Sequence, residues 1–197
     1  KKLKETIKYT SLDYFYDSEE NFEDVYYKIS KHIVELAKEG DLVYAVPGHP
    51  RVAEKTVGII ESMAKENNIE VETIASMSFV DAMFNYLAVD PADGFKLIDA
   101  FEIENSYIDT NTSMIITQIY DHFIASNIKL KLMEYYDYDQ EVCIVNGAGV
   151  KNLESKKYVP LYELDRSENL FNYLTSLYIP KSSKKMYNTV HDLEAIM

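Results

Sequence analysis

The stretch from Asp41 to Arg51 constrains the fold of this chain most strongly. An apolar run, Leu42–Val46, stops abruptly at Pro47-Gly48, and a helical pattern follows from Val52. This order is typical of a buried parallel strand, a tight turn and a helix N-terminus. In open α/β sheets, ligands bind in the crevice beyond the carboxyl ends of the strands, and a glycine lets the backbone approach a ligand closely. The turn is therefore the first candidate ligand site.

The composition argues against two classes of binding partner, nucleic acids and membranes. The formal charge is −13 over 197 residues, and an acidic surface disfavours non-specific binding to nucleic acid, which depends on neutralising phosphates. No apolar run has the length of a membrane span, and no segment has the pattern of a signal peptide. The single cysteine, Cys143, lies in the apolar run 142–145, where we expect a core residue. We predict a cytoplasmic protein without nucleic-acid or membrane partners.

Hydrophobic periodicity predicts an α/β fold. Helices are expected over 19–38, 52–65, 79–87 and 123–136, and strands over 41–46, 71–74, 95–100, 113–119, 141–145, 157–164 and 175–179. Ser18 is a plausible N-cap of the first helix. The initial order of helix and strand implies a parallel sheet with right-handed crossovers. We expect two α/β sub-domains, residues 1–74 and 75–180, followed over 181–197 by a linker and the start of another element.

Small or polar residues follow four of the predicted strands. His49 lies in the turn after the first strand, and the others are found at 76–78, 117–121 and 146–148. This is the layout expected of one shared cleft. His49 either lines a ligand site, acts as an acid or base, or only occupies the turn. Asp121 is either a helix N-cap or a catalytic acid. No Walker A, Gly-x-Gly-x-x-Gly, His-Glu-x-x-His or Cys-x-x-Cys motif is present, so we assign neither a metal site nor a catalytic residue.

Several blocks together resemble one known family. The run Tyr44–Pro50, followed by Val52–Thr56, resembles the Gly-Asp-Pro loop of the tetrapyrrole (corrin/porphyrin) methylases. Further matching blocks occur in the same order at 76–82, 90–95, 117–121, 125–133 and 159–165. The likeness spans roughly residues 9–180 and is greatest to the subgroup fused to a MazG-type nucleotide pyrophosphohydrolase.

The resemblance implies a tetrapyrrole-methylase-like fold, with a ligand cleft between two α/β sub-domains. It also implies S-adenosylmethionine as cofactor, a small-molecule methyl acceptor and a homodimer. Carried over by position, the cofactor-binding residues are Pro47, Gly48, His49, Val52, Met77, Ser78, Phe79, Tyr120, Asn146, Gly147, Ala148 and Thr175.

The chain departs from the family pattern in two places. The family opens with a strand and a Gly-x-Gly-Pro-Gly loop that do not occur here, so we expect the first strand to be absent. His49 stands where the family usually has aspartate. The tail from Tyr187 to Met197 resembles the entry to a MazG-type domain, which we expect as a C-terminal partner in the intact chain.

Three functions are compatible with these residues. The first is an S-adenosylmethionine-dependent methyltransferase-like domain that works mainly by proximity and orientation. The second is a catalytically silent ligand-sensing or docking module that regulates an attached pyrophosphohydrolase. The third is an α/β domain that binds another nucleotide.

Overall fold

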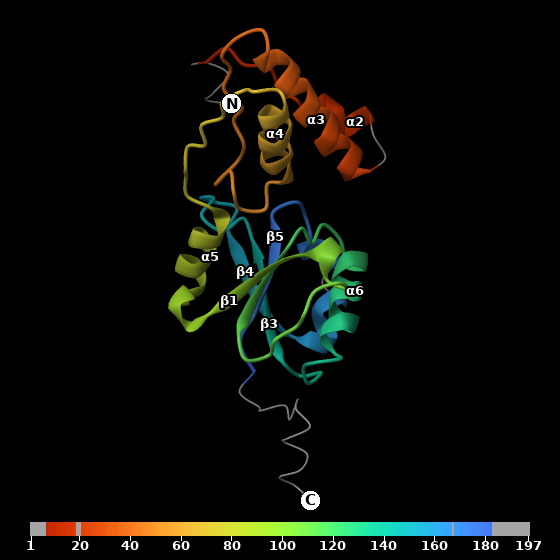
Figure 1. Ribbon diagram of the computed structural model, residues 1–197. Helices are drawn as coiled ribbons and strands as arrows, with labels where there is room; N and C mark the ends of the chain where they lie inside the picture. Colours follow the sequence, from red (N-terminus) through yellow and green to blue (C-terminus); the bar gives the residue numbers. More distant parts are fainter. Residues whose placement is uncertain (1–6, 19–20, 167, 183–197) are drawn as a thin grey trace, which may run out of the picture. The chain divides into compact units, whose positions relative to one another are not determined.

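The computed structural model describes residues 7–18, 21–166 and 168–182, and it divides into two compact units whose boundary follows Ser78 (Figure 1). We call these unit 1 and unit 2 and describe each by itself. In the described part of the chain, no helix is both long and apolar enough to cross a membrane. Most of the predicted tail segment, residues 183–197, lies outside the described residues.

Three helices build the core of unit 1. They are α2 (Tyr14–Ser18), α3 (Phe22–Ala37) and α4 (Lys55–Glu66). The apolar stripe of α3 contributes four buried side chains, Val25, Ile29, Ile33 and Val34, which cluster with Ile60 of α4. The Ser30 hydroxyl, fully buried on α3, donates to the Thr56 carbonyl at 3.3 Å. The two helices are therefore joined by apolar contacts and by one buried hydrogen bond.

Two sequence predictions about helix starts in unit 1 are wrong. Ser18 ends α2, and the N-cap of α3 is Asn21, whose side chain accepts from the Asp24 amide at 2.9 Å. The helix expected from residue 52 begins at Lys55, because Ala53 has a left-handed φ of 54° and Glu54 supplies the N-cap carboxylate. Residues 50–53 therefore belong to the turn.

The expected strands 41–46 and 71–74 do not form among the described residues. Both segments are irregular by hydrogen bonding, and the apolar side chains expected to be buried are exposed, with Val43 92% and Ile74 77% accessible. A strand requires a hydrogen-bonded neighbour, and neither segment has one in the described part of the chain. The sequence prediction of strands at 41–46 and 71–74 is therefore wrong for the described residues.

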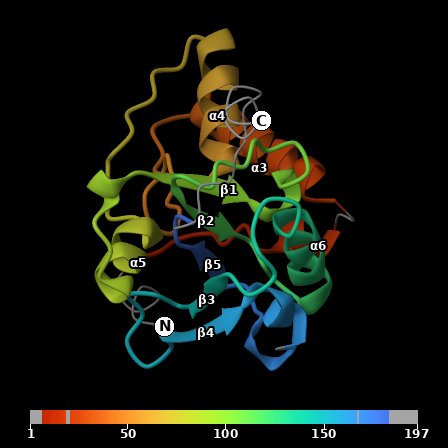
Figure 2. The same ribbon diagram turned by 90° about the horizontal axis from the view of Figure 1, so that it is seen from below.

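Unit 2 is built on one five-stranded mixed sheet with the order β1-β2-β5-β3-β4 (Figure 2). The strands are β1 (Phe95–Asp99), β2 (Ser113–Thr117), β3 (Glu141–Asn146), β4 (Ser155–Pro160) and β5 (Thr175–Ile179). The pair β1 and β2 is parallel, and the other neighbouring pairs are antiparallel. Residues 161–166, partly predicted as strand, form the 3₁₀ helix η3 (Leu161–Arg166).

Helices lie on opposite sides of this sheet, α5 (Phe79–Leu87) on one and α6 (His122–Leu132) on the other (Figures 1 and 2). Asp121 is the N-cap of α6, as one of the two sequence interpretations held. Every residue of β2 is buried, as is typical of a strand covered on both faces. Cys143 of β3 is also buried, which makes it a core residue, and burial raises the pKa of its thiol.

An ion pair joins α6 to η3. Lys129 Nζ lies 2.5 Å from Asp165 Oδ2, and both side chains are less than one-fifth exposed. Burial opposes ionisation of Asp165. Hydrogen bonds from Lys129 and Ser126 outweigh that effect and hold the pKa of the carboxyl below its usual value. The pair therefore stabilises unit 2 when Asp165 is ionised.

The loop after β3 lies close against α5. Gly149 has a φ of +79°, and a Cβ placed on it would lie 2.8 Å from the Cβ of Ala82. Near the same loop, Lys156 Nζ donates to the Tyr86 carbonyl at 2.8 Å. Glycine at 149 is thus required both by its left-handed backbone and by the close approach of the helix.

We expect the Lys129–Asp165 pair to make stability pH-dependent. Because the folded pKa of Asp165 is depressed, its contribution is fully present above the unfolded value of 3.8 and is lost as pH falls through the folded pKa. Asp165→Asn should lower the free energy of unfolding of unit 2 by about 2 kcal/mol at pH 7. The difference from wild type should shrink below about pH 4 in urea titrations. Glu163→Gln is the control. Glu163 is half-buried and its only described ion pair, with Arg166, is long at 3.9 Å, so this change should alter stability by less than about 0.5 kcal/mol. A pH-independent effect of Asp165→Asn would contradict the assignment.

Gly149→Ala should destabilise unit 2 more than Gly94→Ala, its matched control. Gly94 has a similar φ of +86°, but a Cβ there would lie 3.6 Å from Thr112 Cγ2, an ordinary contact. The positive φ alone should cost about 1–3 kcal/mol at either position, and the clash with Ala82 should add about 1–3 kcal/mol at residue 149. Urea denaturation measures both costs, and equal values would show that the loop is not held against α5.

Candidate functional site

The strand directions of unit 2 gather several predicted site residues at one end of the sheet. Strands β1, β2 and β3 run the same way, because β2 and β3 are each antiparallel to β5, which lies between them. The last residues of β1, β2 and β3 and the first residue of β5 therefore lie at the same end. We call it the Asn146 end and define it by Asp99, Thr117, Asn146 and Thr175.

A polar cluster lies at the centre of this end. Asn146 and Thr175 face each other in the β3–β5 register, and both are more than nine-tenths buried. Asn146 Oδ1 accepts two hydrogen bonds, from Thr175 Oγ1 at 2.6 Å and from Asn172 Nδ2 at 3.1 Å. These two donors fix the orientation of the Asn146 amide. Its Nδ2 group has no partner among the described residues and is available to donate to a ligand.

The loop after β3 turns sharply beside this cluster. Gly147 and Gly149 both have left-handed φ angles, 54° and 79°. The Gly147 amide donates to the Leu174 carbonyl at 3.1 Å, and the Gly149 amide donates to the Glu154 carboxylate at 3.3 Å. The amide between them, on Ala148, has no partner in the described part of the chain. Ala148 N–H and Asn146 Nδ2 are thus two neighbouring donors on one short segment.

Aromatic side chains continue the same end toward β2 and β1. Tyr120 lies between Phe101, at a ring-centroid distance of 6.1 Å, and Tyr173, at 5.2 Å. The Ile119 amide donates to the Thr175 carbonyl at 3.5 Å, which connects this aromatic group to the polar cluster. The three rings provide flat apolar surface suited to a planar ligand.

A short hydrogen-bond chain holds Tyr120. Its hydroxyl donates to Gln118 Oε1 at 2.9 Å, and Gln118 Nε2 donates to Asp99 Oδ2 at 3.0 Å. Gln118 has a φ of 64°, an unfavourable region for a residue with a side chain. Such strain persists only where the surrounding contacts hold it, and it is concentrated at ligand-binding sites.

The predicted residues of unit 1 occupy a separate turn. Gly48 has a φ of 77°, and a Cβ placed on it would lie 3.7 Å from the Met77 carbonyl oxygen, so these two predicted residues are neighbours. His49 Nδ1 accepts from the Arg51 amide at 3.1 Å, and the Val52 amide donates to the His49 carbonyl at 3.0 Å. The imidazole therefore stabilises the turn, and its Nε2 is the ring nitrogen left for other contacts.

The structure thus brings together five of the twelve predicted residues at the Asn146 end, namely Tyr120, Asn146, Gly147, Ala148 and Thr175. Pro47, Gly48, His49, Val52 and Met77 lie in unit 1. Ser78 is buried at the unit boundary, and Phe79 begins α5. The cofactor-binding role of all twelve stays a prediction. Within the described ranges, no three His, Cys, Asp or Glu side chains are grouped as metal ligands.

Sequence reasoning missed five residues of this end, Asp99, Phe101, Gln118, Asn172 and Tyr173. Gln118 lies inside a block that was already singled out, 117–121, and its position after a buried strand was a usable signal. Asn172 and Tyr173 precede the last strand, and nothing local marks them. Their importance follows from β5 pairing with β3, which is a long-range contact.

Comparison with known proteins assigns the family. The sequence profile of the "Tetrapyrrole (Corrin/Porphyrin) Methylases" matches residues 1–165. The uncharacterized protein YabN of Bacillus subtilis (strain 168) is 41% identical over 196 residues, which are 98% of this chain and 40% of that protein. The chain therefore spans well under half the length of this curated relative.

Solved structures agree in fold. A uroporphyrin-III-C-methyltransferase from Thermus thermophilus superposes with a TM-score of 0.65 at 15% identity, over 78% of this chain and 70% of that one. The methyltransferase CobJ gives 0.60 at 12% identity, over 82% and 74%. A Thermus thermophilus enzyme complexed with S-adenosyl homocysteine gives 0.56 at 14% identity, over 81% and 73%. With a mixed α/β fold like theirs and a profile match over most of its length, this chain belongs to the tetrapyrrole (corrin/porphyrin) methylase family.

Proposed function

We propose that this chain is the S-adenosylmethionine-binding, methyltransferase-like domain of a longer protein. The observation that carries the proposal is the Asn146 amide, whose oxygen is held by Thr175 and Asn172 and whose Nδ2 is left without a partner in the described residues. Membership of the methylase family and a similar solved structure complexed with S-adenosyl homocysteine support the choice of ligand.

The Asn146 end offers what an adenosyl group requires. Asn146 Nδ2 and Ala148 N–H can donate to the ring nitrogens of adenine, and the aromatic faces of Tyr120 and Tyr173 can cover a flat base. Because hydrogen bonds from Thr175 and Asn172 already orient the Asn146 amide, little ordering of its Nδ2 group is needed on binding.

In the proposed reaction, the methyl group passes from the sulfonium sulfur to a nucleophile of a small-molecule acceptor. The carbon–sulfur bond breaks as the new bond to carbon forms, and the sulfur keeps the electron pair. The residues of this chain contribute by binding and orienting the reactants. We assign no general base.

For the intact protein we propose a homodimer with a C-terminal MazG-type nucleotide pyrophosphohydrolase domain. This chain covers 40% of the Bacillus subtilis relative, which leaves room for a further domain, and the sequence of the tail from Tyr187 resembles the entry to such a domain.

A second candidate is a catalytically silent module that senses a ligand for the attached domain. It is favoured by the turn at 47–52, which carries no carboxylate and in which His49 Nδ1 is already engaged by the Arg51 amide. Transfer of a labelled methyl group by the intact protein to any small molecule of a cell extract would support the methyltransferase and exclude the silent module.

We expect the full natural chain to bind S-adenosylhomocysteine in calorimetric titrations, and Asn146→Ala to weaken that binding by at least about tenfold. Loss of one ligand hydrogen bond in a buried site costs about 1.4 kcal/mol or more, which corresponds to that factor. Thr175→Val, which removes one of the two donors that orient Asn146, should weaken binding to a smaller extent.

The matched control is Asn111→Ala. Asn111 lies just before β2, at the opposite end of that strand from Thr117, and its side chain bonds only Asp109 among the described residues. This variant should bind as wild type does. Circular dichroism would establish that all three variants fold. If the wild-type chain binds ATP but not S-adenosylhomocysteine, the proposed function is wrong.

A further inference from the structure

Gln118 has a backbone conformation that its place in the fold does not explain. Its φ of 64° lies in the left-handed region, which is unfavourable for a residue with a Cβ. The other non-glycine residues with positive φ in the described part of the chain are two alanines and two asparagines, Ala53, Asn68, Ala88 and Asn152. Asparagine tolerates this region, and Asn68 and Ala88 directly follow the ends of α4 and α5, where a left-handed residue is common. Of these described residues, only Gln118 has a long side chain, and it lies between a strand and a helix.

The side chain of Gln118 supplies a reason for the residue. Its Nε2 donates to Asp99 Oδ2 at 3.0 Å, and its Oε1 accepts from the Tyr120 hydroxyl at 2.9 Å. Both ends of the amide are used, which fixes its orientation. The Asp99 carboxylate is held in turn, because its Oδ1 accepts from the Phe101 amide at 3.0 Å. Glycine at position 118 would remove the strain but could make neither side-chain bond.

The ring of Tyr120 depends on this amide for its orientation. Its two ring neighbours, Phe101 and Tyr173, are themselves 51% and 83% exposed, so ring packing restrains it weakly. The backbone beside it is anchored, since the Ile119 amide donates to the Thr175 carbonyl at 3.5 Å. The hydroxyl bond to Gln118 adds a directional contact that ring packing cannot replace.

We propose that Gln118 is a positioning residue, which fixes the ring of Tyr120 in the orientation that covers the adenosyl group. This inference rests on the proposed function of the Asn146 end. Strained backbone persists where surrounding contacts hold it, and it is concentrated at binding sites. Gln118 acts through Tyr120 and not by touching the ligand. It removes ring motion that binding would otherwise have to freeze.

Two substitutions of Gln118 separate positioning from stability. Gln118→Ala and Gln118→Gly both remove the side chain, but only glycine relieves the strain. In the full natural chain, we expect the melting temperature of Gln118→Gly to exceed that of Gln118→Ala by about 2–4 °C. Both variants should bind S-adenosylhomocysteine about three- to tenfold more weakly than wild type in calorimetric titrations, because immobilising one side chain has a cost of that size. A loss of affinity that follows the melting temperature, and is larger for alanine, would overturn the proposal.

Ala88→Gly is the matched control for the backbone. Ala88 has a similar φ of 57°, is exposed and directly follows α5 in the same unit. This variant should melt about 2–4 °C above wild type and should bind S-adenosylhomocysteine as wild type does. An equal loss of affinity in Ala88→Gly would overturn the proposal, because the effect at residue 118 would then come from the backbone.

Coupling between Gln118 and Tyr120 is a result that a structural role alone would not produce. Tyr120→Phe keeps the ring and removes the hydroxyl, so it should weaken binding to the same extent as Gln118→Gly. The double variant should bind within about twofold of either single variant, because both changes break the same hydrogen bond. Losses that multiply in the double variant would show that the two residues act independently and would contradict the proposal.

The positioning role and the proposed function fail in different ways. If the wild-type chain does not bind S-adenosylhomocysteine, the proposed function is wrong, and the positioning role is wrong with it. If wild type and both Gln118 variants bind equally well, the proposed function stands and only the positioning role is wrong.

Discussion

The candidate site depends on the antiparallel pairing of β5 with its two neighbours, β2 and β3. Its register places Thr175 opposite Asn146, and its entry turn brings Asn172 and Tyr173 to the same end of the sheet. Because β2 and β3 both pair with β5, they run in the same direction, and their last residues are neighbours in space. A shift of β5 by one residue would turn Thr175 to the other face and would leave the Asn146 amide without its strongest hydrogen bond.

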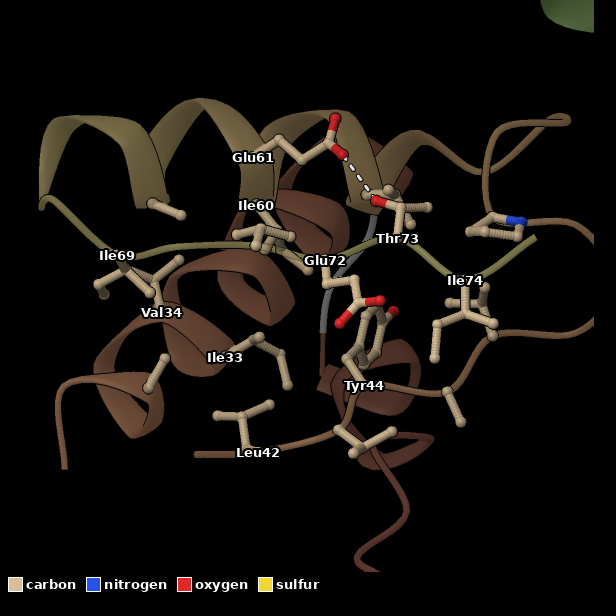
Figure 3. Close-up of a pocket in the computed structure, with 18 of the residues that line it drawn as sticks. Ile33, Val34, Leu42, Tyr44, Ile60, Glu61, Ile69, Glu72, Thr73 and Ile74 are labelled. Atoms are coloured by element: carbon tan, nitrogen blue, oxygen red, sulfur yellow. Dashed lines mark hydrogen bonds between the residues drawn. The ribbon is translucent and has the colours of Figure 1, made fainter. Parts of the chain in front are cut away.

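The two units differ in how the backbone N–H and C=O groups of their extended segments are hydrogen-bonded. In unit 2 the hydrogen-bond ladder is continuous from β1 to β4, and the interior strand β2 is fully buried. In unit 1, the segments 41–46 and 71–74 are held by side-chain hydrogen bonds, from Tyr44 to Thr56 and from Thr73 to Glu61 (Figure 3). The units differ in that neighbouring strands complete the hydrogen bonding in unit 2, whereas no described strand does so for 41–46 and 71–74 in unit 1.

Most elements could be predicted from local patterns. The helix 79–87 and the strand 175–179 have the predicted bounds, and the remaining strands of unit 2 differ by a few residues. The wrong predictions of helix and strand ends occurred where one local pattern is compatible with two structures. The helix predicted to 136 ends at Leu132, and residues 161–164 continue an apolar strand pattern but turn into η3, where Asp165 pairs with Lys129. Half of the candidate site at the Asn146 end was also predictable, because glycine-rich and polar turns after strands are local signals.

The sequence by itself indicated the family, through the resemblance of several blocks in the same order, and it predicted most helices and strands of unit 2 through their periodicity. It also marked the turns that carry Gly48 and Gly147, because glycine adopts positive φ angles readily. Only the tertiary structure decided which strand ends meet, that Asn172 orients Asn146, and that 41–46 and 71–74 remain unpaired. Strand pairing joins residues distant in the chain, and its free energy depends on the neighbour that is present, so no local pattern of residues encodes it.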